Sequence, residues 1–417
     1  MTLRLTPDQR AAARGDLGEG IRRAMLLVTA LAEATDATEL IPVTRAHVDA
    51  ALYHGPSSLE FVEWLLSGGA RVAVPTTLNV ASLDLLHPWT FRGDPAVAEA
   101  GRSLVDGYVR LGCLPTLTCA PYQEANRPGR GEHVAWAESN AIVFVNSVLG
   151  ARSARYGDFV DVAAAITGWV PLSGLHVAAN RRATLVVELD TGVAARLTDE
   201  SHFGALGLIV GAHAGVRVPA IVGLPDATGE DDLKALGAAA ASSGAVAMFH
   251  AVGITPEAPT LGACIADGPV PERVRVGWSD LRAAASALAT APDGPIDAVC
   301  LGTPHFSVAE FGRLREALAT STGPLHADCI VTTSRAVLET ITALGWTDDL
   351  TSAGIEILTD TCSYVSQVLR RPAGTVMTNS AKWAHYAPAN LASRVVYGSL
   401  AECVASARAG TVIRLDR

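Results

Sequence analysis

The sequence has little positive charge and few aromatic residues, and no run of Lys or Arg stands out in it. Its 417 residues include 32 basic and 42 acidic side chains, for a net charge of -10, and aromatic residues make up 5%. Binding to nucleic acid requires a basic face that neutralises phosphates. This composition therefore excludes nucleic acid as an expected partner.

Long apolar segments and a signal peptide are also lacking. The longest stretch without a formal charge, residues 235–256, is broken at 242–244 and by His250, so it predicts a buried helix, turn and strand rather than a membrane span. The N-terminus has no apolar core, and Asp8 and Asp16 fall within its first 16 positions. We expect a cytoplasmic protein with no membrane partner.

Several motifs that indicate common chemistries are missing. The sequence contains no G-x-x-x-x-G-K-[ST], no G-x-G-x-x-G after a first strand, no H-E-x-x-H and no G-x-S-x-G. Nucleotide hydrolysis, NAD-dependent redox chemistry and serine hydrolysis therefore lose support. The seven cysteines include no C-x-x-C pair and are odd in number, which argues against a compact zinc site and a disulfide framework.

Small apolar and β-branched residues are abundant. Hydrophobic residues reach 49% and charged ones 18%, a composition typical of a compact α/β protein, and the length predicts two or three domains. Short apolar runs alternate with helical windows, which indicates parallel or mixed sheets covered on both faces. The predicted strands are residues 71–75, 141–145, 184–189, 207–210, 221–224, 245–249, 298–301, 325–331, 355–358 and 375–377.

Helix starts are marked by local signals. Thr6 as N-cap, Pro7 as first helical residue and Gln9 three positions after the cap predict a helix with a capping box. A second helix is predicted over residues 16–34, where apolar residues share one face. Ser307 and Glu310 predict another capping box.

Polar loops follow four predicted strands in the last third of the chain. They are residues 303–307, 332–335, 360–363 and 379–382, and they contain His305, Cys362 and Lys382. Ligands of open α/β sheets bind beyond the carboxyl ends of strands, so four such loops could line one site. A single Ser/Thr-rich loop is more often only a helix cap, and the prediction depends on all four together.

The first half of the chain holds comparable polar clusters. Arg offers a planar fork that pairs with a carboxylate, so such clusters suit a small, polar, carboxylate-bearing substrate. The alternative is that the Asn side chains only satisfy turn backbones. The candidate binding residues are Thr76, Thr77, Asn79, Asn140, Asn146 and Arg152, with Ser139 beside them.

The cysteines differ in their surroundings. Cys119 and Cys362 each follow a Thr in a polar loop. From the residues alone, these two thiols remain open between core packing, a nucleophile and a metal ligand. Four others are expected as small core side chains: Cys113, Cys264, Cys300 and Cys403.

Six stretches of the chain form a distinctive set. They read LIPVTRAHVDAALY, VPTTLNVASLD, TCAPYQEANRPGRGEHVAWAESNAIVFVNSVLGARSARYGDF, LGTPHFSVAEF, TDTC and TNSAKWAHYAP. Together they resemble the aconitase X family, a branch of the aconitase superfamily, over essentially the whole chain. The resemblance implies an aconitase-like fold of three α/β domains, with parallel or mixed sheets around a central cleft. We expect these domains at residues 1–130, 131–275 and 276–417.

The resemblance also implies a partner. Family members consist of a large catalytic subunit that works with a small swivelling domain, either fused to it or carried on a separate chain. With 417 residues, this chain is similar to the stand-alone large subunit. We therefore expect a heterodimer with a small swivelling-domain subunit.

Members of the family are lyases that remove water from small hydroxy acids. The resemblance implies iron as a Lewis acid at the departing hydroxyl, held by Cys119 and Cys362. A third cysteine ligand would have to be supplied by Cys329 or Cys300, and Cys329 is the candidate. Thiolates suit iron and iron–sulfur centres. Thr303 stands where the phosphomevalonate-type pattern has a further Cys, so we expect mononuclear iron or a reduced cluster.

The expected reaction is dehydration of cis-3-hydroxy-L-proline to Δ1-pyrroline-2-carboxylate. By resemblance to aconitase-like enzymes, the base that removes the α-proton is a serine of the swivelling domain. Lys382, His305 and Ser139 are expected to support acid–base steps or to donate hydrogen bonds. The Thr, Asn and Arg candidates of the first half are expected around the substrate carboxylate and ring nitrogen.

Three alternatives stay open. The first is dehydration of mevalonate 5-phosphate, whose phosphate needs a cationic pocket. The second is a non-catalytic or regulatory subunit with a decayed metal site, because Thr303 replaces a ligand. The third is acyl transfer by a Cys119 nucleophile, which requires a His base within reach.

Overall fold

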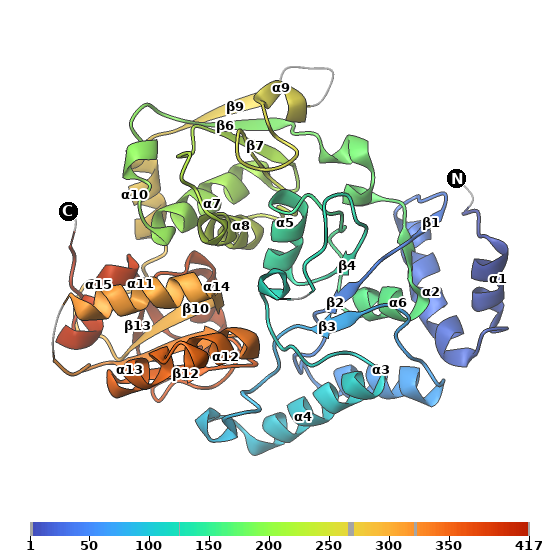
Figure 1. The fold of residues 1–417 in the computed structure, drawn as a ribbon, viewed down its shortest axis with the longest axis horizontal. Coiled ribbons are helices and arrows are strands. Elements are labelled where there is room, and N and C mark those ends of the chain that lie inside the picture. The colour runs from blue at the N-terminus through green and yellow to red at the C-terminus, as the bar shows by residue number, and fades with distance from the viewer. Residues whose placement is uncertain (1–2, 125, 266–270, 321–322, 416–417) are drawn as a thin grey trace. The chain divides into compact units, whose positions relative to one another are not determined.

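The computed structural model describes residues 3–124, 126–265, 271–320 and 323–415, and the chain divides into two compact units. Unit 1 consists of Met1–Ser82 and Asp94–Arg182, and unit 2 of Leu83–Gly93 and Ala183–Arg417. Both units combine helices with sheets in which most strands are parallel, which confirms the predicted α/β class (Figure 1). Among the described residues, no helix combines the length and the apolar character that crossing a bilayer requires.

Unit 1 contains a small parallel sheet and a short antiparallel pair. In the parallel sheet, β2 lies between β3 and β4, and in the other pair β1 runs antiparallel to β5. α6 packs against β2 and α2, and α3 packs against α4 (Figure 1). The strands are β1 (Leu40–Pro42), β2 (Ala46–Val48), β3 (Thr76–Leu78), β4 (Ala135–Trp136) and β5 (Trp169–Pro171). The described α-helices are α1 (Pro7–Arg14), α2 (Glu19–Ala34), α3 (Pro56–Ser67), α4 (Pro95–Arg110), α5 (Ser139–Ser147) and α6 (Val160–Thr167).

Unit 2 contains two parallel sheets, with strand orders β8-β7-β6-β9 and β12-β11-β10-β13-β14. The first has β6 (Leu185–Leu189), β7 (Pro219–Val222), β8 (His250–Ala251) and β9 (Glu272–Val276). The second has β10 (Ala298–Phe306), β11 (Asp328–Thr333), β12 (Ile355–Leu358), β13 (Thr375–Thr378) and β14 (Arg394–Tyr397). The described α-helices are α7 (Glu200–Ala214), α8 (Glu230–Ser243), α9 (Leu261–Cys264), α10 (Trp278–Ala287), α11 (Val308–Ala319), α12 (Arg335–Ala343), α13 (Trp346–Ser352), α14 (Ala381–Leu391) and α15 (Leu400–Ala409).

The local helix signals are confirmed. Thr6 Oγ1 accepts from the Gln9 backbone N–H at 3.2 Å, and Gln9 Oε1 accepts from the Thr6 backbone N–H at 2.9 Å. Ser307 and Glu310 form the same reciprocal pair at the start of α11. Six of the predicted strands overlap strands of the structure in whole or in part. They are residues 184–189, 221–224, 298–301, 325–331, 355–358 and 375–377.

The strand predicted at residues 141–145 is wrong, because these residues form the middle of helix α5. The carboxylate of Glu138 caps this helix by accepting from the Ala141 backbone N–H at 2.7 Å. Residues 140–147 are all buried, so the helix has no exposed face that would mark it as amphipathic. A short apolar run of this kind lacks the periodicity that distinguishes a helix from a buried strand.

Three further strand predictions are also wrong. Residues 207–210 belong to α7, where an added Cβ at Gly207 would lie 2.2 Å from the Leu236 carbonyl oxygen of α8. This glycine lets the two helices pack closely side by side (Figure 1). Residues 71–75 bond to the backbones of Leu111 and Ala165 and precede β3. Residues 245–249 likewise precede β8.

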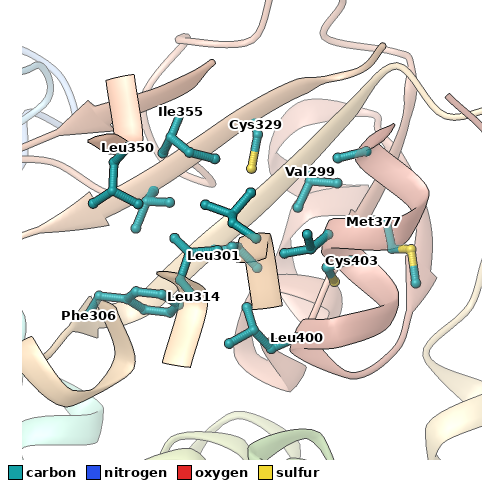
Figure 2. Close-up of a cluster of buried hydrophobic side chains, with 14 of the residues drawn as sticks. Val299, Leu301, Phe306, Leu314, Cys329, Leu350, Ile355, Met377, Leu400 and Cys403 are labelled. Atoms are coloured by element: carbon teal, nitrogen blue, oxygen red, sulfur yellow. The ribbon is translucent and has the colours of Figure 1, made fainter. Parts of the chain in front are cut away.

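The larger sheet of unit 2 is covered by apolar side chains on both faces, as expected for an all-parallel sheet. α11, α12, α13 and α15 contribute to one apolar cluster, in which Val299, Cys329 and Cys403 lie close together (Figure 2). The opposite cluster is built around Trp383 of α14, with side chains from α8 and α10. The sheet is thus fixed from both sides, and the loops after its strands are anchored.

The described strand pairing runs across both expected domain boundaries. The boundary expected between residues 130 and 131 lies inside unit 1, where β4 pairs with β2. The boundary expected between residues 275 and 276 lies inside β9, which pairs with β6 along its length. β4 has two residues and β9 is largely exposed, so neither strand shows the apolar pattern from which a strand is predicted.

Candidate active site

Two of the predicted side chains, His305 and Cys362, come together within unit 2. His305 lies near the carboxyl end of β10, and Cys362 lies in the loop after β12. A ring nitrogen of His305 and Cys362 Sγ lie within 4.8 Å of one another, and both side chains are buried. β10 and β12 flank β11 in a parallel sheet, so their carboxyl ends lie at the edge where ligands bind. The two side chains are candidate ligands of one metal ion.

A hydrogen bond fixes the tautomer of His305. Its Nε2 lies 2.9 Å from the Thr361 carbonyl oxygen, and because that oxygen only accepts, Nε2 carries the proton. Nδ1 then presents the lone pair through which a neutral imidazole binds a metal. The same bond joins the strand of His305 to the residue before Cys362, and so it sets the spacing of the two side chains.

The loop that leads to Cys362 is held in a rare backbone conformation. Asp360 has φ of 62°, in the left-handed region that non-glycine residues seldom adopt. Its carboxylate accepts two hydrogen bonds from Arg335, at 2.6 and 2.7 Å. The Thr359 backbone N–H donates to Asp84 at 2.9 Å. These contacts fix the loop, and with it the position of Cys362.

A buried ion pair supports the backbone at His305. Lys234 of α8 donates to the carboxylate of Glu310 and, at 3.3 Å, to the His305 carbonyl oxygen. Burial acts to lower the pKa of Lys234, but the carboxylates of Glu310 and Asp231 act more strongly in the opposite direction. The pKa is therefore raised above its ordinary value, and the side chain is cationic. Lys234 therefore links a helix of the first sheet of unit 2 to the strand that carries His305.

Lys382 and Thr303 line a small cavity in unit 2. Lys234, Glu310 and Ser380 are among its other lining residues, and its volume of about 20 Å³ has room for about one water molecule. Thr303 Oγ1 is buried and has no hydrogen-bond partner among the described residues. The cavity thus suits an ordered water between a hydroxyl and two lysine side chains, and it is too small for a hydroxy acid.

In unit 1, Asn140 binds the backbone of Cys119 directly. Its Nδ2 donates to the Cys119 carbonyl oxygen at 2.7 Å and to Glu138 Oε2 at 2.6 Å, while Tyr122 donates to its Oδ1 at 2.7 Å. The hydroxyl of Ser139 donates to Glu138 Oε1 at 3.3 Å. Asn140 therefore connects the buried Cys119 loop to the start of α5.

The two threonines of β3 have different partners. Thr77 Oγ1 lies 2.8 Å from His47 Nδ1 and accepts from Asn126 Nδ2 at 2.7 Å. Burial lowers the pKa of His47 to about 4, so this imidazole is neutral at pH 7. Thr76 Oγ1 donates to the Val74 carbonyl oxygen at 2.8 Å. Thr77 thus belongs to a buried polar network, and Thr76 to its own chain segment.

Asn79 contacts a carboxylate that the sequence analysis missed. Asn79 follows β3, Asp49 follows the neighbouring β2, and Asn79 Nδ2 donates to Asp49 Oδ1. Asp161 Oδ2 in turn accepts from the Asp49 backbone N–H at 2.6 Å. Burial raises the pKa of both acids, that of Asp161 to about 7. The missed signal was an Asp directly after an apolar strand, in AHVDA, because so short a strand was not recognised.

Asn146 and Arg152 bond to a segment at the end of α5. Asn146 Oδ1 accepts from the Ser153 backbone N–H at 3.0 Å and from Arg181 Nη1 at 2.9 Å. Arg152 Nη1 donates to the His176 carbonyl oxygen at 3.0 Å. These bonds hold the backbone between residues 146 and 181, and both side chains therefore have a structural part here.

Cys329 lies in β11 with its sulfur inside the apolar cluster of the larger sheet (Figure 2). Burial raises its pKa to about 12, which disfavours the thiolate that a metal requires. Burial raises the pKa of Cys113 to about 12 in the same way. Cys329 is therefore placed as a core thiol, in contrast to Cys362, which lies in a polar loop beside His305.

Comparison with known families covers nearly the whole chain. Sequence profiles of the aconitase X first, second and third domains match residues 2–179, 183–286 and 296–409, respectively. The chain belongs to the aconitase X family. The three matched segments agree with the two units, because the first segment corresponds to most of unit 1 and the other two lie in unit 2.

Several named relatives of this aconitase X chain are dehydratases. Cis-3-hydroxy-L-proline dehydratase of Hypocrea jecorina is 40% identical over 98% of this chain and 69% of its own length, and that of Pseudomonas aeruginosa is 41% identical over 98% and 70%. The phosphomevalonate dehydratase large subunit of Methanothermobacter thermautotrophicus is 38% identical over 92% of this chain and 93% of its own length. A crystal structure of aconitase X from Thermococcus kodakaraensis in its holo-form, at 32% identity, superposes with a TM-score of 0.87 over 97% of this chain and 100% of the other.

Proposed function

We propose that this chain is the large subunit of a hydro-lyase that converts cis-3-hydroxy-L-proline to Δ1-pyrroline-2-carboxylate. The observation that carries the proposal is its identity of 40% and 41%, over 98% of its length, to two proteins with that named activity. Loss of the α-proton and the 3-hydroxyl gives an enamine, which tautomerises to the cyclic imine. Water is the one species released, so the reaction balances without an oxidant or a reductant.

We assign an iron centre to Cys119, His305 and Cys362. Thiolate and imidazole are ligands that suit iron, and the proximity of His305 to Cys362 within unit 2 supports a shared ion. Cys119 is assigned through its position in the family block, and Asn140 orients its backbone. Bound iron supplies a Lewis acid that stabilises the departing hydroxide. Because Thr303 offers a hydroxyl in place of a further thiolate, the proposed centre is mononuclear iron or a reduced cluster.

The other polar residues are assigned to orientation and proton handling. Lys382 and Lys234 border the same small cavity, so we assign Lys382 to hold a water close to Thr303. Ser139 donates to Glu138, and we assign it to orient that carboxylate. As a proposed metal ligand, His305 loses the acid–base part that the sequence suggested for it. The base for the α-proton is assigned to the partner chain.

The proposed partner is a small swivelling-domain subunit on a separate chain. Support comes from relatives that are named large subunits, and this chain covers 93% of the length of one and 98% of the length of another. A heterodimer is therefore the proposed active form. Its cytoplasmic location stays a prediction from the sequence.

Mevalonate 5-phosphate is the second candidate substrate, because five relatives, at 31% to 38% identity, are named phosphomevalonate dehydratase large subunits. A phosphate requires cationic groups around it. In unit 1, however, the residues that follow β2 and β4 include the carboxylates Asp49 and Glu138. This local negative charge favours hydroxyproline.

The experiment that tests the proposal is co-production with the small subunit, anaerobic purification, and incubation with each substrate in D2O. We expect iron in the complex, and conversion of cis-3-hydroxy-L-proline to an imine that carries deuterium at C3 from the tautomerisation step. Conversion of mevalonate 5-phosphate alone would reverse the choice of substrate. An iron-free complex that converts neither compound would support the non-catalytic alternative.

A further inference from the structure

Each strand of the parallel sheet in unit 1 is followed by a polar side chain. Asp49 is the first residue after β2, Asn79 the first after β3, and Glu138 the second after β4. Because the strands are parallel and Val48 pairs with Leu78, these residues emerge at the same edge of the sheet. The hydrogen bond from Asn79 Nδ2 to Asp49 Oδ1 shows the first two in direct contact.

The surroundings of Asp49 are strongly negative. Burial raises its pKa well above the ordinary value for an aspartate, and the charges of Glu138, Asp158 and Asp161 add to the effect. Asp161 is fully buried and accepts hydrogen bonds from the Asp49 and Val162 backbone N–H groups at 2.6 and 2.7 Å. Asp49 itself is partly exposed, so a ligand can reach its carboxylate.

An unfilled acceptor lies beside this carboxylate. Asn79 is 4% exposed, and its Oδ1 has no hydrogen-bond partner among the described residues. A buried acceptor without a partner is unfavourable, as is a half-buried carboxylate without a counter-charge. Both deficits are removed by one group that is positively charged and donates two hydrogen bonds. A protonated secondary amine has these properties, with two N–H bonds on one nitrogen.

A metal ion fits these residues less well. Ca²⁺ and Mg²⁺ require several oxygen ligands that converge on one point. Among the described residues, no three metal-binding side chains that include Asp49 or Glu138 bring their ligand atoms within 4.8 Å of one another. One carboxylate and one amide oxygen suit an ammonium group instead.

We propose that Asp49 and Asn79 bind the protonated ring nitrogen of the substrate and so select a cyclic amino acid over an anionic hydroxy acid. The inference rests on the proposed function, because it identifies the ring amine of cis-3-hydroxy-L-proline as the ligand. Within unit 1, Asn140 connects the neighbouring Glu138 to the Cys119 backbone. The ammonium site is thereby linked to a loop that we assign to the iron.

The test compares two inhibitors of the heterodimer that share a ring and a carboxylate. L-Proline carries the ring ammonium, and tetrahydrofuran-2-carboxylate has a neutral ether oxygen in its place. In the unmodified enzyme we expect L-proline to bind about tenfold more tightly, the worth of one charge-assisted hydrogen bond. In Asp49→Asn, which keeps an acceptor for Asn79, that preference disappears, and KM for cis-3-hydroxy-L-proline rises about tenfold with a smaller change in kcat.

Asp161→Asn is the matched control, because Asp161 is a buried acid of the same cluster that is already satisfied by backbone N–H groups. We expect it to lower the melting temperature and to leave the preference for L-proline in place. The inference is overturned if Asp49→Asn keeps the preference for L-proline. It is also overturned if the substitution instead changes how the activity depends on Mg²⁺ or K⁺. If the enzyme does not turn over hydroxyproline, the proposed function fails separately, and direct calorimetric binding of the two inhibitors still decides this inference.

Discussion

Arg335 holds Asp360 through a two-point contact, from Nε to Oδ1 at 2.6 Å and from Nη2 to Oδ2 at 2.7 Å. The carboxylate is fully buried, and burial raises its pKa while Arg335 opposes the rise. The contact fixes Asp360 at its positive φ, two residues before Cys362. A half-buried arginine therefore fixes the loop that carries a proposed metal ligand.

Arg335→Ala should weaken both the fold and iron retention. It leaves a buried carboxylate without its counter-charge, at a cost of about 2 kcal/mol in the free energy of unfolding, and it releases the loop that carries Cys362. Urea denaturation and the iron content of the purified complex measure the two effects. Arg110→Ala is the control, because its pair with Glu63 is more than half exposed and should contribute less than about 1 kcal/mol. Equal iron content in both variants would contradict the prediction.

Lys234→Met should be strongly destabilising, and Glu310→Gln should partly rescue it. The single substitution leaves the buried Glu310 carboxylate without its counter-charge, at a cost of about 3 to 5 kcal/mol, whereas the double variant removes that charge. The free energies of unfolding of the unmodified protein, the two single variants and the double variant together form a double-mutant cycle. A double variant no more stable than Lys234→Met would show that the ion pair is not the source of the loss.

His47 should make the protein less stable in acid. Burial lowers its pKa from 6.5 to about 4, so the unfolded chain binds a proton in this range and the folded one does not. This contribution to stability is complete above pH 6.5 and is lost as the pH falls towards 4, by about 3 kcal/mol in total. Urea denaturation of the unmodified protein and of His47→Gln at pH 4.5 and 7 isolates the effect. An identical pH dependence in the two proteins would contradict it.

Local signals were sufficient for parts of this fold and insufficient for others. The capping boxes at Thr6 and Ser307 were predictable because every atom involved lies within three residues. Helix α5 was not, because burial on all sides removes the amphipathic pattern from which a helix is recognised.

The candidate site shows the same division. Cys119 and Cys362 were predicted as ligands from the family resemblance, and His305 was predicted from its polar loop as an acid–base residue. The role proposed for Asp49, in contrast, depends on its contact with Asn79, thirty positions later in the chain. That contact exists because β2 and β3 pair in parallel, and β2 has only three residues. Three residues are too few to show an alternation of apolar and polar side chains. Which strands pair cannot be predicted from either segment alone.

One experiment should distinguish the proposed ligands Cys119 and Cys362 from Cys329, which we place in the core. Cys119→Ser and Cys362→Ser replace a thiolate by a hydroxyl of similar size, so we expect most of the iron to be lost and with it the dehydratase activity. Cys329→Ala removes a sulfur from the apolar cluster, at a cost of about 1 kcal/mol in the free energy of unfolding, and should retain its iron. Iron per chain and urea denaturation, measured together on the anaerobic complex, distinguish a ligand from a core residue. If Cys329→Ala lost its iron and Cys362→Ser retained it, Cys329 would be the ligand and Cys362 the core residue. A thiol that only fills space affects stability and not metal content.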